Sequence, residues 1–150
     1  MDEAPRRRVL RTAAEVPVAL VEEIADDMAV RLSGTVEARS CAGLSFSYVV
    51  SDRRVPRYRY AVGEGGGVTL TRRDSAPSTF VFTATVGTFD DVLRGRASAL
   101  VCLLTGRVHL TGSFLRIRSL LRLMPAVERA YVAARRSVID RHADRYDVRF

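Results

Sequence analysis

The sequence predicts one domain that mixes helices and strands, and three observations support this prediction. Apolar residues recur at helical spacing over 17–34 and again over 113–141. Between these segments, five short runs alternate apolar and polar residues with the period of two that is typical of strands. The chain has 150 residues, close to the common size of one domain, and 47% of them are apolar. A core can therefore form without disulfides.

The first helix is predicted to begin at Pro17, because a proline in the first turn loses no hydrogen bond. Ser33 and Gly34 end it, since glycine suits a left-handed cap. Four apolar side chains share its face: Leu20, Ile24, Met28 and Leu32. Residues 1–11 are predicted to be a mobile polar arm. Acidic residues interrupt the N-terminal apolar stretch, so we expect no signal peptide, no membrane span and a cytoplasmic protein.

The middle of the chain is predicted to form four strands. They cover 44–50, 57–62, 68–72 and 79–86, and the short connections between them favour antiparallel pairing in a meander. The glycine-rich turn at 63–67 joins two strands. It lacks the helix N-terminus that would bind phosphate, so we interpret it as a hairpin turn.

The second half is predicted to contain two short helices, a fifth strand over 107–111 and a long final helix. Thr88 is suited to cap the first short helix, and Gly106 stops the second, which covers 97–104. Pro125 is expected to kink or split the final helix near Met124. The tail over 142–150 is predicted to be polar and loose.

One segment carries a family resemblance. In 89–123 an acidic helix ends at Gly95 and an apolar helix follows. Next comes a frame of glycine, basic, apolar, any, apolar, any, glycine, with Gly106, Arg107, Val108, Leu110 and Gly112 at its defined positions. This order resembles the C-terminal half of the sterol carrier protein (SCP-2-like) domain family, and the resemblance extends over about 17–124.

The resemblance implies an α+β fold with a five-stranded, mainly antiparallel sheet. Helices would cover one face of the sheet, an apolar tunnel would lie between them, and this chain would add an extended C-terminal helix. The resemblance also implies binding of lipids, sterols or fatty acyl groups in the tunnel.

Several side chains are candidates to line this tunnel. The three strand tyrosines either complete an aromatic core or orient a polar group of an apolar ligand. Arg72 either reaches solvent or meets a ligand carboxylate. The apolar face of the final helix is either core or ligand wall, with Met124 as a flexible gate. The predicted lining is Phe46, Tyr48, Tyr58, Tyr60, Leu70, Arg72, Phe80, Phe82, Leu110, Phe114, Ile117, Leu121, Met124, Val127 and Tyr131.

No metal site or cofactor site is predicted. His109 and His142 have no cysteine or carboxylate partner at metal-ligand spacing. Cys41 and Cys102 lie far apart in the chain and suggest neither a disulfide nor a redox pair.

The charge comes from 24 basic residues, all arginine, and 17 acidic residues, for a net charge of +7. The absence of lysine suggests a G+C-rich bacterial genome. The arginines are spread along the chain, which does not favour nucleic acid as a partner. A stripe on the final helix is either a solvated face or a weak contact for anionic lipid headgroups or an acidic carrier domain; it contains Arg118, Arg122, Arg129 and Arg136. Both a monomer and a homodimer are compatible with the sequence.

Two functions are compatible with these observations. The first is a binding protein that shields a lipid, sterol, acyl or polyketide-like molecule, since each buried CH₂ group contributes about 0.8 kcal/mol. The second is a cofactor-free enzyme that cyclises (for example by ring or spiroacetal closure) or dehydrates a polyketide-like substrate in a bacterial natural-product pathway. It would need positioning and one proton donor and acceptor. Tyrosines and a carboxylate such as Glu37, Asp52 or Glu64 would serve. The binding function ranks above the enzymatic one because no set of residues in the sequence indicates a catalytic site.

Overall fold

The computed structural model describes residues 5–54, 57–72 and 76–150. The strands are β1 (Arg8–Leu10), β2 (Ser45–Val50), β3 (Arg57–Val62), β4 (Val68–Arg72), β5 (Phe80–Ala84), β6 (His109–Gly112) and β7 (Tyr146–Val148). The α-helices are α1 (Val18–Leu32), α2 (Val36–Arg39), α3 (Val86–Leu93), α4 (Ala99–Leu104) and α5 (Ile117–Arg141). Three 3₁₀ turns complete the list: η1 (Ala13–Glu15), η2 (Glu64–Gly66) and η3 (Phe114–Arg116).

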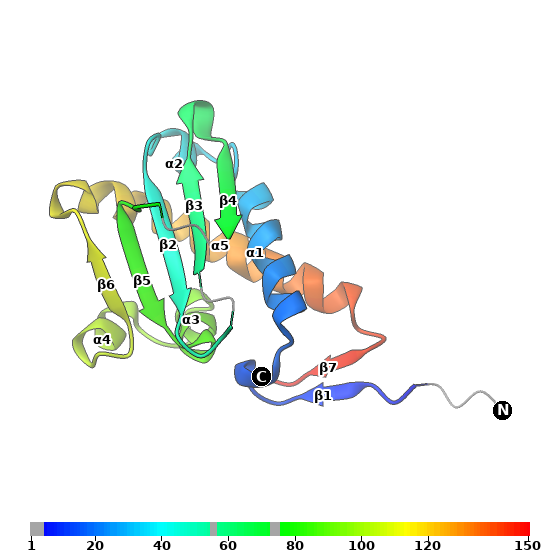
Figure 1. Ribbon diagram of the computed structural model, residues 1–150. Helices are drawn as coiled ribbons and strands as arrows, with labels where there is room; N and C mark the ends of the chain where they lie inside the picture. The colour runs from blue at the N-terminus through cyan, green and yellow to red at the C-terminus, as the bar shows by residue number, and fades with distance from the viewer. Residues whose placement is uncertain (1–4, 55–56, 73–75) are drawn as a thin grey trace.

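The main sheet confirms the predicted α+β class, and its five strands follow the order β4-β3-β2-β5-β6. Three of its four pairings are antiparallel, but β2 and β5 run parallel. The predicted meander is therefore wrong at β5, which lies beside β2 and not beside β4 (Figure 1).

The reason is the segment that leads into β5, which crosses the sheet and is fixed by polar side chains of β2 and β3. Ser45 and Thr79 exchange hydrogen bonds, with the Thr79 amide 2.9 Å from Ser45 Oγ. Ser47 Oγ lies 2.6 Å from Ser78 Oγ, and Arg57 donates to the carbonyl of Ala76 at 3.0 Å. The sequence predicts a turn over 74–78, between β4 and β5, and of this turn Asp74 and Ser75 lie outside the described residues.

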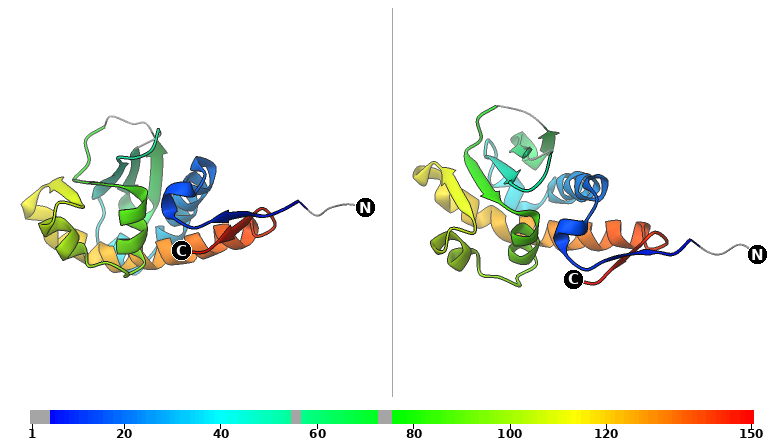
Figure 2. Two further views of the ribbon diagram at one scale, coloured as in Figure 1. Left: turned by 90° about the horizontal axis from the view of Figure 1, so that it is seen from below. Right: turned by 60° about the horizontal axis from the view of Figure 1, so that its bottom comes forward.

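Helices cover one face of the sheet. On this face α5 crosses beneath the strands and packs along α1 (Figure 2). The extended final helix is confirmed, but Pro125 does not split it: α5 runs unbroken from Ile117 to Arg141. A proline leaves the carbonyl four residues earlier without its helical partner. That carbonyl belongs to Leu121, and both residues are exposed, so water can satisfy it.

The two ends of the chain form a small parallel ribbon of β1 and β7 (Figure 1). Leu10 pairs with Val148, and the Leu10 side chain is fully buried. The predictions of a mobile arm over 1–11 and a loose tail over 142–150 are therefore wrong over these strands, since each end supplies the other with hydrogen bonds and apolar cover. Residues 1–4 of the predicted arm lie outside the described part.

Two element boundaries differ from the prediction. Thr85, and not Thr88, caps α3, with Thr85 Oγ1 accepting from the Thr88 amide at 3.2 Å. The fifth strand, β6, begins two residues later than expected, at His109. None of the helices in the described residues is long and apolar enough to cross a membrane.

Candidate functional site

An apolar cavity lies where α1, α3, α5 and the terminal ribbon meet the ends of β2 and β3. The space open to the centre of a water-sized sphere is about 100 Å³, and the cavity is partly open to solvent. Aliphatic and aromatic side chains form nearly all of its wall, including Leu10, Leu20, Val21, Ile24, Ala25, Met28, Val50, Phe89, Leu93, Val138, Ile139, Val148 and Phe150. Such a wall favours an apolar occupant over ordered water.

Of the side chains predicted to line a tunnel, four line this cavity: Tyr48, Tyr58, Tyr60 and Tyr131. Three others are buried in the filled core, namely Phe46, Phe80 and Val127. Five pack partly buried against that core, namely Leu70, Phe82, Leu110, Ile117 and Met124. Phe114 and Leu121 are 89% and 64% exposed, so their assignment to an internal lining is wrong. The α5 residues that line the cavity all follow Met124 in the sequence, and of them only Tyr131 was in the predicted lining.

Arg72, on the edge strand β4, is held by α1 and does not line the cavity. Its guanidinium lies 2.5 Å from Asp26 Oδ1 and donates to the carbonyl of Glu22 at 3.2 Å. This ion pair raises the pKa of Arg72. The side chain is 32% exposed. Arg72 was expected to reach solvent or to meet a ligand carboxylate, and it instead contacts Asp26 and Glu22 of α1.

Tyr48 is the cavity residue with the least satisfied polar group. Its ring packs edge-on against Phe89 and stacks on Phe82. Its hydroxyl is buried and has no hydrogen-bond partner among the described residues. Burial raises the pKa of Tyr48, and the carboxylate of Glu128 adds to the rise. The phenol therefore stays protonated at neutral pH and is free to donate.

Tyr60 differs from Tyr48 because its hydroxyl has a hydrogen-bond partner in the core. The hydroxyl of Tyr60 donates to the carbonyl of Ala25 at 3.0 Å, so this side chain completes the core as well as lining the cavity. Burial raises the pKa of both Tyr58 and Tyr60. The interpretation as an aromatic core residue fits Tyr60, because its hydroxyl has a hydrogen-bond partner in the core. The interpretation as a residue that orients a polar group of a ligand fits Tyr48, because its hydroxyl has no such partner among the described residues.

A buried carboxylate at one end of the cavity was not predicted. Asp90, on α3, is 4% exposed. Its Oδ1 accepts from the Tyr131 hydroxyl and from Arg135 Nε at 2.9 Å, and its Oδ2 accepts from Arg94 at 3.1 Å. Burial and the Asp90 carboxylate raise the pKa of Tyr131. This cluster ties α3 to α5 and gives the apolar cavity one polar end.

The C-terminal residue Phe150 closes the same end. Its ring lies 5.0 Å from the guanidinium carbon of Arg135, and its carbonyl accepts from Arg135 at 3.0 Å. Arg135 therefore bridges Asp90 and Phe150 and joins the terminal ribbon to the polar end of the cavity.

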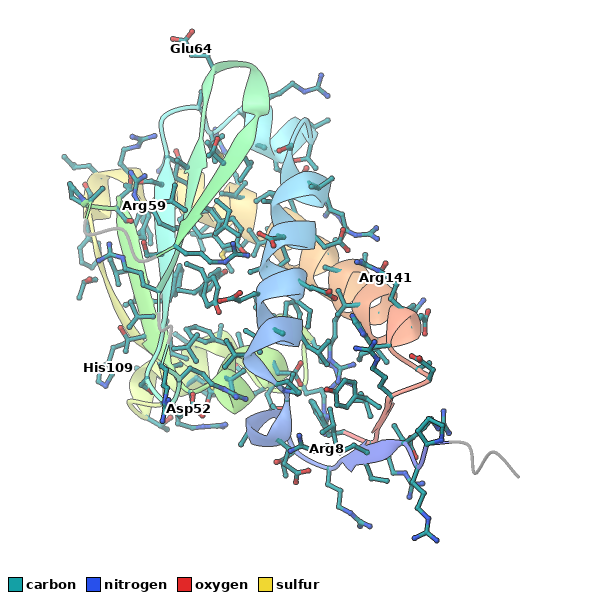
Figure 3. All side chains as sticks on the ribbon, turned by 45° about the vertical axis from the view of Figure 1, so that its right-hand side comes forward. Arg8, Asp52, Arg59, Glu64, His109 and Arg141 are labelled. Carbon is teal, nitrogen blue, oxygen red and sulfur yellow. The ribbon has the colours of Figure 1, made fainter. Side chains whose placement is uncertain are left out.

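The carboxylates considered from the sequence lie elsewhere. Asp52 accepts from the amide of Val86 at 2.9 Å, Glu37 pairs with Arg129 at 2.5 Å, and Glu64 is exposed at the tip of η2 (Figure 3). His142 lies 2.7 Å from Glu23. In the part of the chain that the structure describes, no group of three or more His, Cys, Asp or Glu residues could hold a metal ion.

Solved structures share this fold at low sequence identity. A ubiquinone synthesis protein, UbiJ-SCP2, aligns with a TM-score of 0.56 and 13% identity over 79% of this chain and 98% of its own. The sterol carrier protein domain 2 of Helicoverpa armigera aligns with a TM-score of 0.59 and 13% identity over 73% and 89% of the two chains. Both alignments confirm the fold expected from the resemblance of 89–123.

A third structure contains the fold as part of a larger chain. The sec-alkylsulfatase Pisa1 from Pseudomonas sp. aligns with a TM-score of 0.55 and 17% identity over 66% of this chain but only 15% of the sulfatase. No protein-family model and no curated protein matches the sequence. The comparisons therefore establish the architecture of the chain.

Proposed function

We propose that this chain, which has the fold of the sterol carrier protein domains, binds an apolar small molecule in the cavity beside Tyr48. The observation that carries the proposal is the Tyr48 hydroxyl, which is buried in the wall of an apolar cavity and has no hydrogen-bond partner in the part of the chain that the structure describes. A buried polar group without a partner costs about 1–3 kcal/mol. A carbonyl or hydroxyl oxygen on the ligand would remove that cost.

The proposed ligand is a lipid, sterol, acyl or polyketide-like molecule with one polar group among apolar atoms. Ligand pockets commonly enclose about 300–1,000 Å³, and this cavity is smaller, at about 100 Å³. It therefore suits a small apolar molecule or the end of a longer one. A longer ligand would pass beside the terminal ribbon, where Leu10 and Val148 form one wall together with Phe150, which follows β7.

Filling the cavity is expected to block binding without unfolding the chain. Ala25 and Ala29 lie one turn apart on α1, and both are buried, but only Ala25 lines the cavity. We expect Ala25→Leu to weaken binding of a fluorescent fatty acid about tenfold or more, equivalent to about 1.4 kcal/mol. The free energy of unfolding should stay within about 1 kcal/mol of the parent, because the added carbons enter empty space. Probe titration and urea denaturation measure the two effects.

Ala29→Leu is the matched control. Its added carbons meet filled core, which is expected to lower the free energy of unfolding by about 1–3 kcal/mol while probe binding persists. If Ala25→Leu leaves probe binding unchanged, or if the control loses binding equally while still folded, the cavity is not the binding site.

Tyr48→Phe is expected to separate polar from apolar recognition. A ligand with a carbonyl group should bind about five- to tenfold more weakly, because one hydrogen bond contributes about 0.5–1.5 kcal/mol. A hydrocarbon ligand should bind as before. Tyr60→Phe is the control, because the Tyr60 hydroxyl is already bonded to the carbonyl of Ala25. It should reduce stability by about 1 kcal/mol and leave both affinities unchanged. Equal losses for the two ligands in Tyr48→Phe would contradict the assigned hydrogen bond.

An alternative proposal is that the same cavity cyclises or dehydrates a polyketide-like substrate. It is favoured by one observation, that a free phenol, Tyr48, and a carboxylate, Asp90, line the same cavity. Product formation from a linear polyketide-like precursor, compared with buffer, tests it. Turnover that Tyr48→Phe abolishes and Tyr60→Phe retains would favour this enzyme over a binding protein.

A further inference from the structure

The edge of the fold opposite the terminal ribbon exposes an unusual amount of apolar surface. In α4, Cys102 is the buried residue, whereas Leu100 and Leu104 are 64% and 79% exposed. In η3, Phe114 and Leu115 are 89% and 97% exposed. Soluble proteins rarely leave such a set of large apolar side chains in water unless it meets a partner.

The elements that carry these side chains lie on one flank of the molecule. The strand β6 joins α4 to η3, and Figure 1 shows the two at opposite ends of β6 on the same flank. Figure 2 keeps both on that flank in its two further views. Figure 3 shows His109 of β6 directed outward there. We call this surface the β6 edge, and it comprises α4, β6, η3 and the exposed side chains Arg118, Leu121 and Arg122 at the start of α5.

The segment that contains the β6 edge is rich in arginine, and three arginines belong to the β6 edge itself: Arg116, Arg118 and Arg122. The 36 residues over 92–127 contain six arginines and no acidic residue, which leaves 18 basic and 17 acidic residues elsewhere. Arg94 and Arg107 pair with Asp90 and Asp91. The other four form no ion pair with an acidic side chain of the described residues: Arg96, Arg116, Arg118 and Arg122.

We propose that the β6 edge docks the protein on the surface of an anionic lipid bilayer. Apolar side chains inserted at the boundary of headgroups and acyl chains, ringed by arginine, are the chemistry that binds such a surface. Phe114 and Leu115 enter this boundary with Leu104, and Arg118 and Arg122 stay at the level of the lipid phosphates. This inference does not depend on the proposed ligand.

Two other occupants fit the surface less well. A second copy docked through the same edge would bring two arginine clusters together without an acidic side chain between them, and such like-charge contacts oppose association. Nucleic acid would pair with the arginines but leave Leu104, Phe114 and Leu115 in water. An anionic bilayer satisfies both the charge and the apolar surface.

The test is flotation of the full chain with phosphatidylcholine vesicles that contain or lack phosphatidylglycerol. We expect binding that requires phosphatidylglycerol and weakens with added salt. The pairs Phe114→Ser with Leu115→Ser and Arg118→Gln with Arg122→Gln should each weaken it about tenfold or more. All four side chains are exposed or solvent-facing, so these variants should fold, as circular dichroism can verify.

Matched controls change equivalent side chains elsewhere. Val30 and Val36 are each 73% exposed, and Arg136 and Arg145 are exposed away from the β6 edge. Val30→Ser with Val36→Ser, and Arg136→Gln with Arg145→Gln, should leave vesicle binding within about twofold. Ala25→Leu should also leave it unchanged, which separates this proposal from the cavity.

Three results would overturn the proposal. The first is no binding that depends on phosphatidylglycerol. The second is an equal loss in the control pairs. The third is a parent chain that forms a dimer and does not bind vesicles, combined with a monomeric double variant Phe114→Ser, Leu115→Ser. That result would assign the β6 edge to self-association.

Discussion

Asp90→Asn is expected to lower the free energy of unfolding by about 3–5 kcal/mol, because it removes one partner from a buried ion pair. Asp90 is 4% exposed and accepts from Tyr131, Arg135 and Arg94. The side chain of Arg135 is 14% exposed, so the substitution would leave a nearly buried guanidinium without a counter-charge. Urea denaturation followed by circular dichroism measures the loss.

Asp91→Asn is the matched control, since it makes the same chemical change one residue further along α3. Asp91 is 39% exposed and lies 4.0 Å from Arg107, so its pair should contribute no more than about 1 kcal/mol. Equal denaturation midpoints for Asp90→Asn and Asp91→Asn would show that the cluster does not hold α3 to α5.

Gly112→Ala is expected to destabilise the chain by about 3 kcal/mol or more, through a clash in the sheet. A Cβ on Gly112 would lie 2.5 Å from the carbonyl oxygen of Thr79 and against the ring of Phe80. Because β6 pairs with β5 at this position, the strand would have to move away. The change in the urea midpoint gives the magnitude.

Gly106→Ala separates the clash from the backbone effect. Gly106 has a φ of 76°, and nothing lies within 4 Å of the position of its Cβ. Its substitution should therefore cost only the left-handed backbone strain of about 1–2 kcal/mol. A loss for Gly112→Ala no larger than for Gly106→Ala would mean that β6 accommodates the methyl group.

The elements of the fold that the sequence predicted are those fixed by local patterns. The helices α1 and α5 follow from apolar spacing of three and four, and β2 and β3 follow from alternation along each strand. The position of β5 beside β2 depends instead on Ser45, Ser47 and Arg57 fixing the crossing segment. Such contacts join residues about 20 to 35 positions apart and leave no periodic signal in either segment.

The terminal ribbon escaped prediction for a similar reason. Leu10 lies in a two-residue apolar run between arginines, and Val148 lies between Asp147 and Arg149, so neither segment has a strand-length apolar pattern of its own. Each becomes part of a strand only through the other. A local sequence pattern contains no information on pairing between the two ends of a chain. Both ends were therefore predicted to be polar and loose.

The candidate site was predicted in part. The strand tyrosines were placed near a cavity by their inward positions, but which of them is satisfied depends on the carbonyl of Ala25 in a different element. Asp90 did leave a signal, because it shares a helical face with Val86, Phe89 and Leu93. A carboxylate in the apolar face of a helix predicts a buried partner, and Arg135 has the corresponding position on α5, between Tyr131 and Val138.

Native mass spectrometry of the chain, purified without denaturant and then offered a fatty acid with a carbonyl group, tests the central claim most directly. We predict one apolar molecule bound per chain, either carried through purification or taken up on addition. It should be lost from Ala25→Leu and retained by Ala29→Leu. A folded chain that carries nothing and takes up nothing would contradict the account, as would one whose occupancy Ala25→Leu leaves unchanged.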